Sequence, residues 1–150
     1  MATYSFLDVQ ATLSGPSGTI DLGCGAGNAQ EGITVSYTDD KGNMLVGADG
    51  SVMHSLRASL AGTITVRLLQ TSETNAKLSV MFNAQTVSST LYGKNTITIR
   101  NAATGDSIVA SQCGFQKMPD LNYAQDGATL EWVFNCGVIN EVIGTGDPEK

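Results

Sequence analysis

Strict alternation between apolar and hydroxyl-bearing residues constrains the fold of this chain more than any other feature. It is clearest in residues 33–38, 63–68 and 95–101, where isoleucine, valine or leucine mostly alternates with threonine, serine or arginine. Successive side chains of a β-strand point to opposite faces, so each segment is expected to be a strand with one face toward a core. The segments at 63–68 and 95–101 share one pattern and are expected to be neighbouring or equivalent strands of one sheet.

Turn sequences divide the rest of the chain into further short strands. The sequence SGPSG at 14–18 separates extended runs at 4–13 and 19–22, which is typical of a hairpin. Further strands are expected at 51–56, 108–115 and 128–139.

One helix is expected between the strands at 63–68 and 95–101. Ser72 is its predicted N-cap, Glu73 lies in its first turn, and Leu78, Met81 and Phe82 form an apolar stripe at helical spacing. Several short strands with one helix predict a mainly β domain of the sandwich or barrel type, spanning residues 1–150.

Two segments are expected to extend from this domain. Polar turns bracket the apolar triplet Met44, Leu45 and Val46, so residues 38–50 are expected to form a protruding arm whose apolar side chains a neighbouring subunit buries. The glycine-containing end at 144–150 is expected to be a mobile tail.

Charge and hydropathy exclude several classes of function. The net charge is -6 and the eight lysines and arginines form no cluster, whereas nucleic-acid binding requires concentrated positive charge. No run approaches the roughly 18 apolar residues of a membrane span, and the first residues lack the pattern of a secretory leader, so no membrane insertion is expected.

The stretch DLGCGAG at 21–27 resembles the glycine-rich first motif of methyltransferases that bind S-adenosylmethionine. That motif requires a buried parallel strand leading into a helix. Here Gly32 and the β-branched residues at 33–35 follow, which favours a strand. A glycine-rich turn is therefore expected, with no cofactor.

No catalytic or metal site is predicted. His54 is the only histidine. Lys41 lies among the possible calcium ligands Asp39, Asp40 and Asn43, and no glutamate stands at the offset of a calcium loop. The three cysteines, Cys24, Cys113 and Cys136, are far apart in sequence and form no Cys-x-x-Cys pair, so reduced thiols are expected.

The hydroxyl faces of the alternating strands allow two interpretations. An ordinary solvated sheet face is one, and a channel lining that does not bind a polyanion is the other. The candidate lining residues are Thr34, Ser36, Thr63, Thr65, Thr96 and Thr98. Arg67 and Arg100 fit a lining poorly and are expected at subunit contacts, paired with carboxylates.

Seven stretches resemble a family of myovirus structural proteins identified as tail tube subunits. They are residues 1–9, 31–35, 46–55, 62–69, 75–78, 83–85 and 95–97. The resemblance implies a β-sandwich-like fold with one helix, assembled as homohexameric rings whose inner strands join into a continuous β-barrel.

The resemblance also implies partners and a location. The rings stack on one another, and DNA transits the lumen without specific binding. The implied partners are the tail sheath, tape measure, baseplate and tail terminator proteins. The protein is then a non-enzymatic component of the virion tail, assembled in the host cytoplasm. A small-molecule- or glycan-binding β-sandwich, or an unrecognised enzyme, is the alternative, and such a module would stay a small species where a tube subunit would form rings or tubes.

Overall fold

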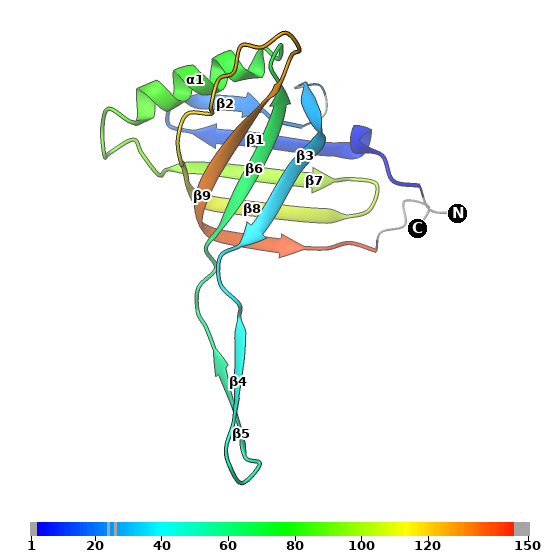
Figure 1. Cartoon of the computed structure of the whole chain (residues 1–150), viewed down its shortest axis with the longest axis vertical. Helices are drawn as coiled ribbons and strands as arrows, with labels where there is room; N and C mark the ends of the chain where they lie inside the picture. The colour runs from blue at the N-terminus through cyan, green and yellow to red at the C-terminus, as the bar shows by residue number, and fades with distance from the viewer. Residues whose placement is uncertain (1–2, 24, 26, 146–150) are drawn as a thin grey trace.

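An antiparallel sheet of seven strands forms the body of the protein (Figure 1). The computed structural model describes residues 3–23, 25 and 27–145. A 3-10 turn, η1 (Phe6–Asp8), is followed by β1 (Val9–Gly15), β2 (Gly18–Asp21), β3 (Asn28–Tyr37), β4 (Gly42–Val46), β5 (Val52–Leu56), β6 (Gly62–Leu69), α1 (Thr74–Gln85), β7 (Asn95–Asn101), β8 (Asp106–Phe115) and β9 (Thr129–Val142). The prediction of a mainly β fold with one helix is confirmed for the described residues.

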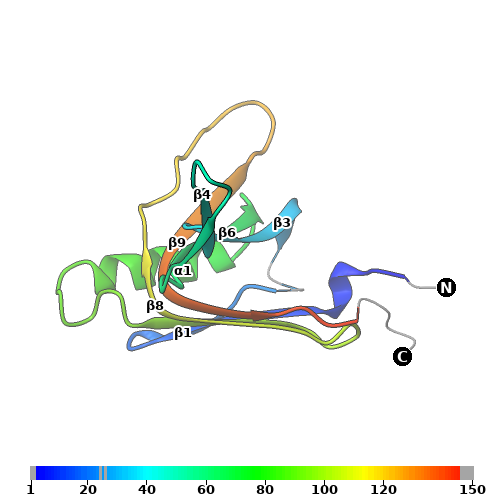
Figure 2. The same ribbon diagram turned by 90° about the horizontal axis from the view of Figure 1, so that it is seen from below.

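The long strand β9 divides the sheet into two layers. The strand order is β2-β1-β7-β8-β9-β6-β3, and residues 129–136 of β9 pair with β6 while residues 134–142 pair with β8. Strands β1, β7 and β8 run across the molecule, and β3, β6 and the first part of β9 cross in front of them (Figures 1 and 2). One sheet therefore folds over itself as a sandwich.

The core lies between the two layers. Ile64 and Val66 of β6 and Ile97 of β7 are fully buried, while the residues between them are partly exposed, as the alternation predicts. Phe115 of β8 contacts the rings of three residues, with centroid distances of 5.5, 5.9 and 4.8 Å to Phe82, Trp132 and Phe134. Aromatic contacts of this kind hold both layers and the helix together.

Helix α1 covers one end of the core and begins one residue later than predicted. Its N-cap is Glu73, and the Ser72 hydroxyl accepts a hydrogen bond from the Thr74 N–H at 3.2 Å. At its other end, the amides of Gln85 and Asn95 exchange two buried hydrogen bonds of 2.7 and 2.8 Å. These bonds join the end of α1 to the start of β7.

Two expectations about the strands need refinement. Strands β6 and β7 belong to one sheet, as expected, but of the two alternatives they are not neighbours, because β8 and β9 lie between them. The first extended run begins at Val9, since Phe6–Asp8 forms a 3-10 turn in which the Ser5 hydroxyl accepts from the Leu7 N–H.

The hairpin of β4 and β5 projects away from the body (Figure 1). All ten of its strand residues are exposed. It occupies the predicted arm segment and continues beyond residue 50 to Leu56. In the predicted tail, the Gly144 N–H donates to the Asp106 carboxylate and the Thr145 N–H donates to the Thr104 carbonyl. Residues 146–150 lie outside the described part of the chain.

Candidate assembly surfaces

Large apolar side chains occupy both faces of the β4–β5 hairpin. Leu45 lies opposite Met53 on one face, and Val46 lies opposite Val52 on the other, next to Met44. These five side chains are between 53% and 62% exposed. A two-stranded hairpin is marginally stable alone, and exposed apolar surface of this kind is typical of interaction sites, so the hairpin is a candidate contact surface. A partner that covers only one face would leave the other in water.

Hydrogen bonds fix the tip and the base of the hairpin. At the tip, the Asp49 carboxylate accepts from the Ser51 N–H at 3.0 Å, and Gly50 adopts a positive φ of 88°. Hydrogen bonds from Ser51, first of all from its backbone, lower the pKa of Asp49 from its ordinary value. At the base, Lys41 Nζ donates to the Arg57 carbonyl at 3.0 Å. The hairpin is therefore a formed element within the subunit.

The six candidate lining residues divide into two groups. Thr34 lies opposite Thr65 and Ser36 opposite Thr63 in the β3–β6 register, so these four form one patch on the outer face of that layer. Thr96 and Thr98 lie on β7, between core-facing residues of the other layer. Because the core separates the layers, the β7 pair faces the opposite side of the molecule.

An arginine that forms an ion pair within the subunit lies beside the four-residue patch. Arg67 Nη1 donates to Thr34 Oγ1 at 2.9 Å, and Arg67 Nε lies 3.4 Å from Glu131 Oε2. Arg67 thus has a carboxylate partner within its own subunit, whereas the sequence led us to expect it at a subunit contact. Arg100 is exposed on the outer side of β7.

The two edge strands, β2 and β3, are each paired on one side within the described chain. An open edge presents backbone donors and acceptors to which a strand of another chain can add. Strand β3 carries two of the four patch hydroxyls, Thr34 and Ser36.

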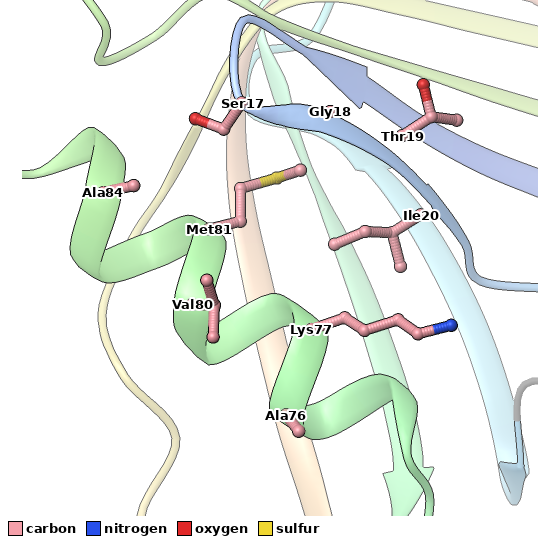
Figure 3. A pocket seen from close by; sticks show the side chains of 9 residues that line it. All are labelled: Ser17, Gly18, Thr19, Ile20, Ala76, Lys77, Val80, Met81 and Ala84. Atoms are coloured by element: carbon pink, nitrogen blue, oxygen red, sulfur yellow. The ribbon is translucent and has the colours of Figure 1, made fainter.

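A groove of about 430 Å³ lies between β2 and α1 (Figure 3). Thr19 and Ile20 line one wall, and Val80, Met81 and Ala84 line the other. The lining is mostly apolar. It contains no nucleophile paired with a base.

The glycine-rich stretch is followed by a strand, whereas the methyltransferase motif that it resembles leads into a helix. β2 ends at Asp21, whose carboxylate accepts from the Gly23 N–H at 3.1 Å, and the next element is the strand β3. Gly23 packs so closely on β1 that an added Cβ would lie 2.6 Å from the Ala11 nitrogen. Cys24, within this stretch, lies outside the described residues.

Other reactive side chains are dispersed. His54 is exposed on β5 opposite Met44. Among the described residues, no three His, Cys, Asp or Glu side chains come together as a metal site would require. No helix in the described ranges is long and apolar enough to cross a membrane.

Sequence reasoning missed several contacts of the folded chain. Val52 and Met53 complete the apolar faces of the hairpin, and their spacing after the turn could have indicated it. Cys113 and Cys136, distant in sequence, have Sγ atoms 3.1 Å apart. The Arg67–Glu131 pair and this thiol contact depend on strand register, which residue spacing does not reveal.

Among the described residues, a folded antiparallel sheet has two open edges and carries an apolar hairpin, and both features are typical of proteins that contact other chains. The chain belongs to the phage tail tube proteins, since residues 1–144 match the family model described as "Bacteriophage PhiTE tail tube protein". No curated protein sequence matches the chain.

Solved structures of contractile injection systems share the fold. A chain of the extracellular contractile injection system PVC, in the sheath/tube terminator in the extended state, superposes with a TM-score of 0.56 at 15% identity, covering 95% of this chain and 98% of that one. A chain of the PVC sheath–tube complex gives 0.54 at 15% identity, covering 89% and 88%. A chain of the anti-feeding prophage cap gives 0.53 at 13% identity, covering 96% and 95%.

Proposed function

We propose that the protein is a structural subunit of a contractile phage tail tube that assembles as hexameric rings, which stack around a channel for DNA ejection. The observation that carries the proposal is the β4–β5 hairpin, which exposes apolar side chains on both faces while the rest of the chain has a buried core. Family membership and the shared fold agree with it.

The hairpin is the ring-to-ring contact in this proposal. Each large apolar side chain that becomes fully covered contributes about 1.5–3 kcal/mol. Leu45 and Met53 lie on one face of the hairpin, and Val46 and Val52 lie on the other. A flat surface would cover only one of these faces. The proposed binding site is therefore a cleft between two subunits of the next ring, which covers both.

The β3–β6–β9 layer supplies the channel wall in this proposal. Its outer face carries Thr34, Ser36, Thr63 and Thr65, and its one arginine is paired with Glu131. Water can hydrate such a face, and its arginine is not free to bind a passing polyanion. Free cationic side chains would bind the phosphates and slow the passage of DNA. Pairing the open edge of β3 with a neighbouring subunit would continue the layer into an inner barrel and remove an exposed edge. Thr96 and Thr98 then face away from the channel.

The partners follow from the proposed assembly. The solved relatives come from a sheath–tube complex and a sheath/tube terminator, and we propose equivalent partners here, with tape measure and baseplate proteins at the tube's interior and end. The protein has no catalytic role or cofactor in this proposal, and it resides in the virion tail after assembly in the host cytoplasm.

Substitution of Leu45→Asp tests the proposal. A charge on one face of the hairpin prevents its burial, so the variant should keep the circular dichroism spectrum of the subunit but form no long tubes by negative-stain microscopy. Val87→Asp is the matched control, because Val87 is 80% exposed and lies outside the hairpin. Normal tubes from Leu45→Asp would refute the hairpin contact. A parent protein that stays a small species at high concentration would instead favour the binding-module alternative.

A further inference from the structure

Two buried thiols meet where β9 passes from one sheet layer to the other. Cys113 of β8 lies directly opposite Cys136 of β9, and their Sγ atoms are 3.1 Å apart. On their other sides, Cys113 is opposite Asn95 of β7 and Cys136 is opposite Gly62 of β6. Both side chains are buried and both thiols are free. The pair therefore occupies the junction of four strands.

The backbone register places the two cysteines at the kind of position where cross-strand bonds close. The Gln116 N–H donates to the Val133 carbonyl at 2.9 Å, which makes these residues a hydrogen-bonded pair. Hydrogen-bonded and non-hydrogen-bonded pairs alternate along an antiparallel ladder, and Cys113 with Cys136 lies three positions further in the same register. It is therefore a non-hydrogen-bonded pair, with Cα atoms about 4.5 Å apart, within the range of about 4.4–6.8 Å seen for disulfides.

We propose that Cys113 and Cys136 form an oxidisable dithiol, a covalent modification site that closes into a disulfide within the subunit when the protein meets a peroxide. The Sγ atoms need to approach by about 1 Å to reach the S–S bond length of about 2.05 Å. This inference concerns the chemistry of the folded subunit and does not depend on the proposed assembly.

The reaction balances with hydrogen peroxide as the oxidant. One thiolate attacks a peroxide oxygen and becomes a sulfenic acid, and the departing hydroxide takes up a proton to form water. The second thiol sulfur attacks the sulfenic sulfur, which forms the S–S bond and releases a second water. Each cysteine sulfur loses one electron, and one peroxide is reduced to two waters.

The two thiols are unequal in a way that suits this order of steps. The hydrogen-bond contact between the two thiols lowers the pKa of Cys113 from its ordinary value, and the same contact, together with burial, raises the pKa of Cys136. Cys113 is thus the more acidic thiol of the pair, which suits it to the first attack, and Cys136 suits the second.

A simpler role for two buried cysteines is packing, because a free cysteine behaves as a small apolar residue. Packing alone predicts that the thiols survive mild oxidation or react as separate groups. An oxidisable dithiol predicts that both free thiols disappear together, through a disulfide within one chain and not between chains. The two roles therefore differ in a measurable product.

The test uses the full chain with Cys24→Ser, which leaves the dithiol as the protein's two cysteines. After mild treatment with hydrogen peroxide, the protein is denatured without reductant and alkylated. We expect no alkylation and an intact mass lower by two hydrogens. Trypsin cleavage after Arg100 and Lys117 should then yield the peptides 101–117 and 118–150 joined, and a reductant should separate them.

Stability provides a second readout. Oxidation should raise the urea midpoint of the Cys24→Ser protein reversibly, because the disulfide closes a loop in the unfolded chain. It should leave the midpoint of the Cys24→Ser, Cys113→Ala control unchanged. Alkylation of both thiols after treatment, a disulfide between chains, or oxygen addition to either sulfur without linked peptides would overturn the proposal.

Discussion

At the residue scale, the folded chain depends on buried polar pairs whose members satisfy one another. Gln85 is fully buried, and its amide exchanges both hydrogen bonds with Asn95. A buried polar group that loses its partner costs more than the hydrogen bond contributes, since it cannot return to water.

Substitution of Gln85→Met should therefore lower the free energy of unfolding by about 1–3 kcal/mol, because it leaves the Asn95 amide unpaired. Urea denaturation followed by circular dichroism measures the change. The control, Asn83→Met, alters an exposed residue of the same helix and should stay within about 0.5 kcal/mol of the parent. Equal stabilities for the two variants would contradict the importance of the pair.

Asp49 gives a pH-dependent signal at the tip of the hairpin. Its pKa is lowered in the folded hairpin, so its contribution to the turn is complete above the ordinary carboxyl pKa and is lost as the pH falls through the lowered value. In dilute, unassembled protein, the Ser51 amide resonance should shift with a midpoint below that of an ordinary aspartate. Asp49→Asn should abolish the transition. A midpoint at or above the ordinary value would show that the tip hydrogen bonds do not form.

At the element scale, local pattern predicted most strands and the helix, and it failed where pairing spans long stretches of sequence. Alternation located β3, β6 and β7 because each has one face in the core. It could not reveal that β8 and β9 lie between β6 and β7, since strand order depends on how β9 pairs on both sides. The hydroxyl residues were found, but their division between two outer faces required the folded sheet.

Cysteine labelling tests which hydroxyl face lines the channel. With Cys24→Ser as the background, Thr65→Cys places a thiol on the β3–β6–β9 layer and Thr98→Cys places one on the opposite side. A maleimide on a carrier wider than duplex DNA should label both variants as free subunits. In assembled tubes, it should label Thr98→Cys but leave Thr65→Cys protected. Equal labelling of Thr65→Cys in both states would remove this face from the channel wall.

At the scale of the whole molecule, the two layers give the subunit two distinct outer sides. One side is a mainly hydroxyl surface with an internally paired arginine, and the other carries β7 with Thr96, Thr98 and the exposed Arg100. Sequence composition indicated a polar surface of low charge, but only the folded structure shows which hydroxyl residues lie on which outer side of the subunit. Residue spacing alone could not distinguish a sandwich from a barrel, and the resemblance to tail tube proteins indicated the sandwich-like fold.

The hairpin has a mechanical consequence that follows from its attachment. The Thr38 N–H donates to the Ala61 carbonyl and the Arg57 N–H to the Lys41 carbonyl, so pairing resumes along the ribbon that joins β3 and β6 to the hairpin. A pull on the hairpin from a neighbouring ring would pass through covalent backbone directly into two strands of the proposed wall. It would act on them along their length, in shear, where many ladder hydrogen bonds share the force. Stretching a tube would then distribute the strain over the whole wall, and the contacts between rings would deform little.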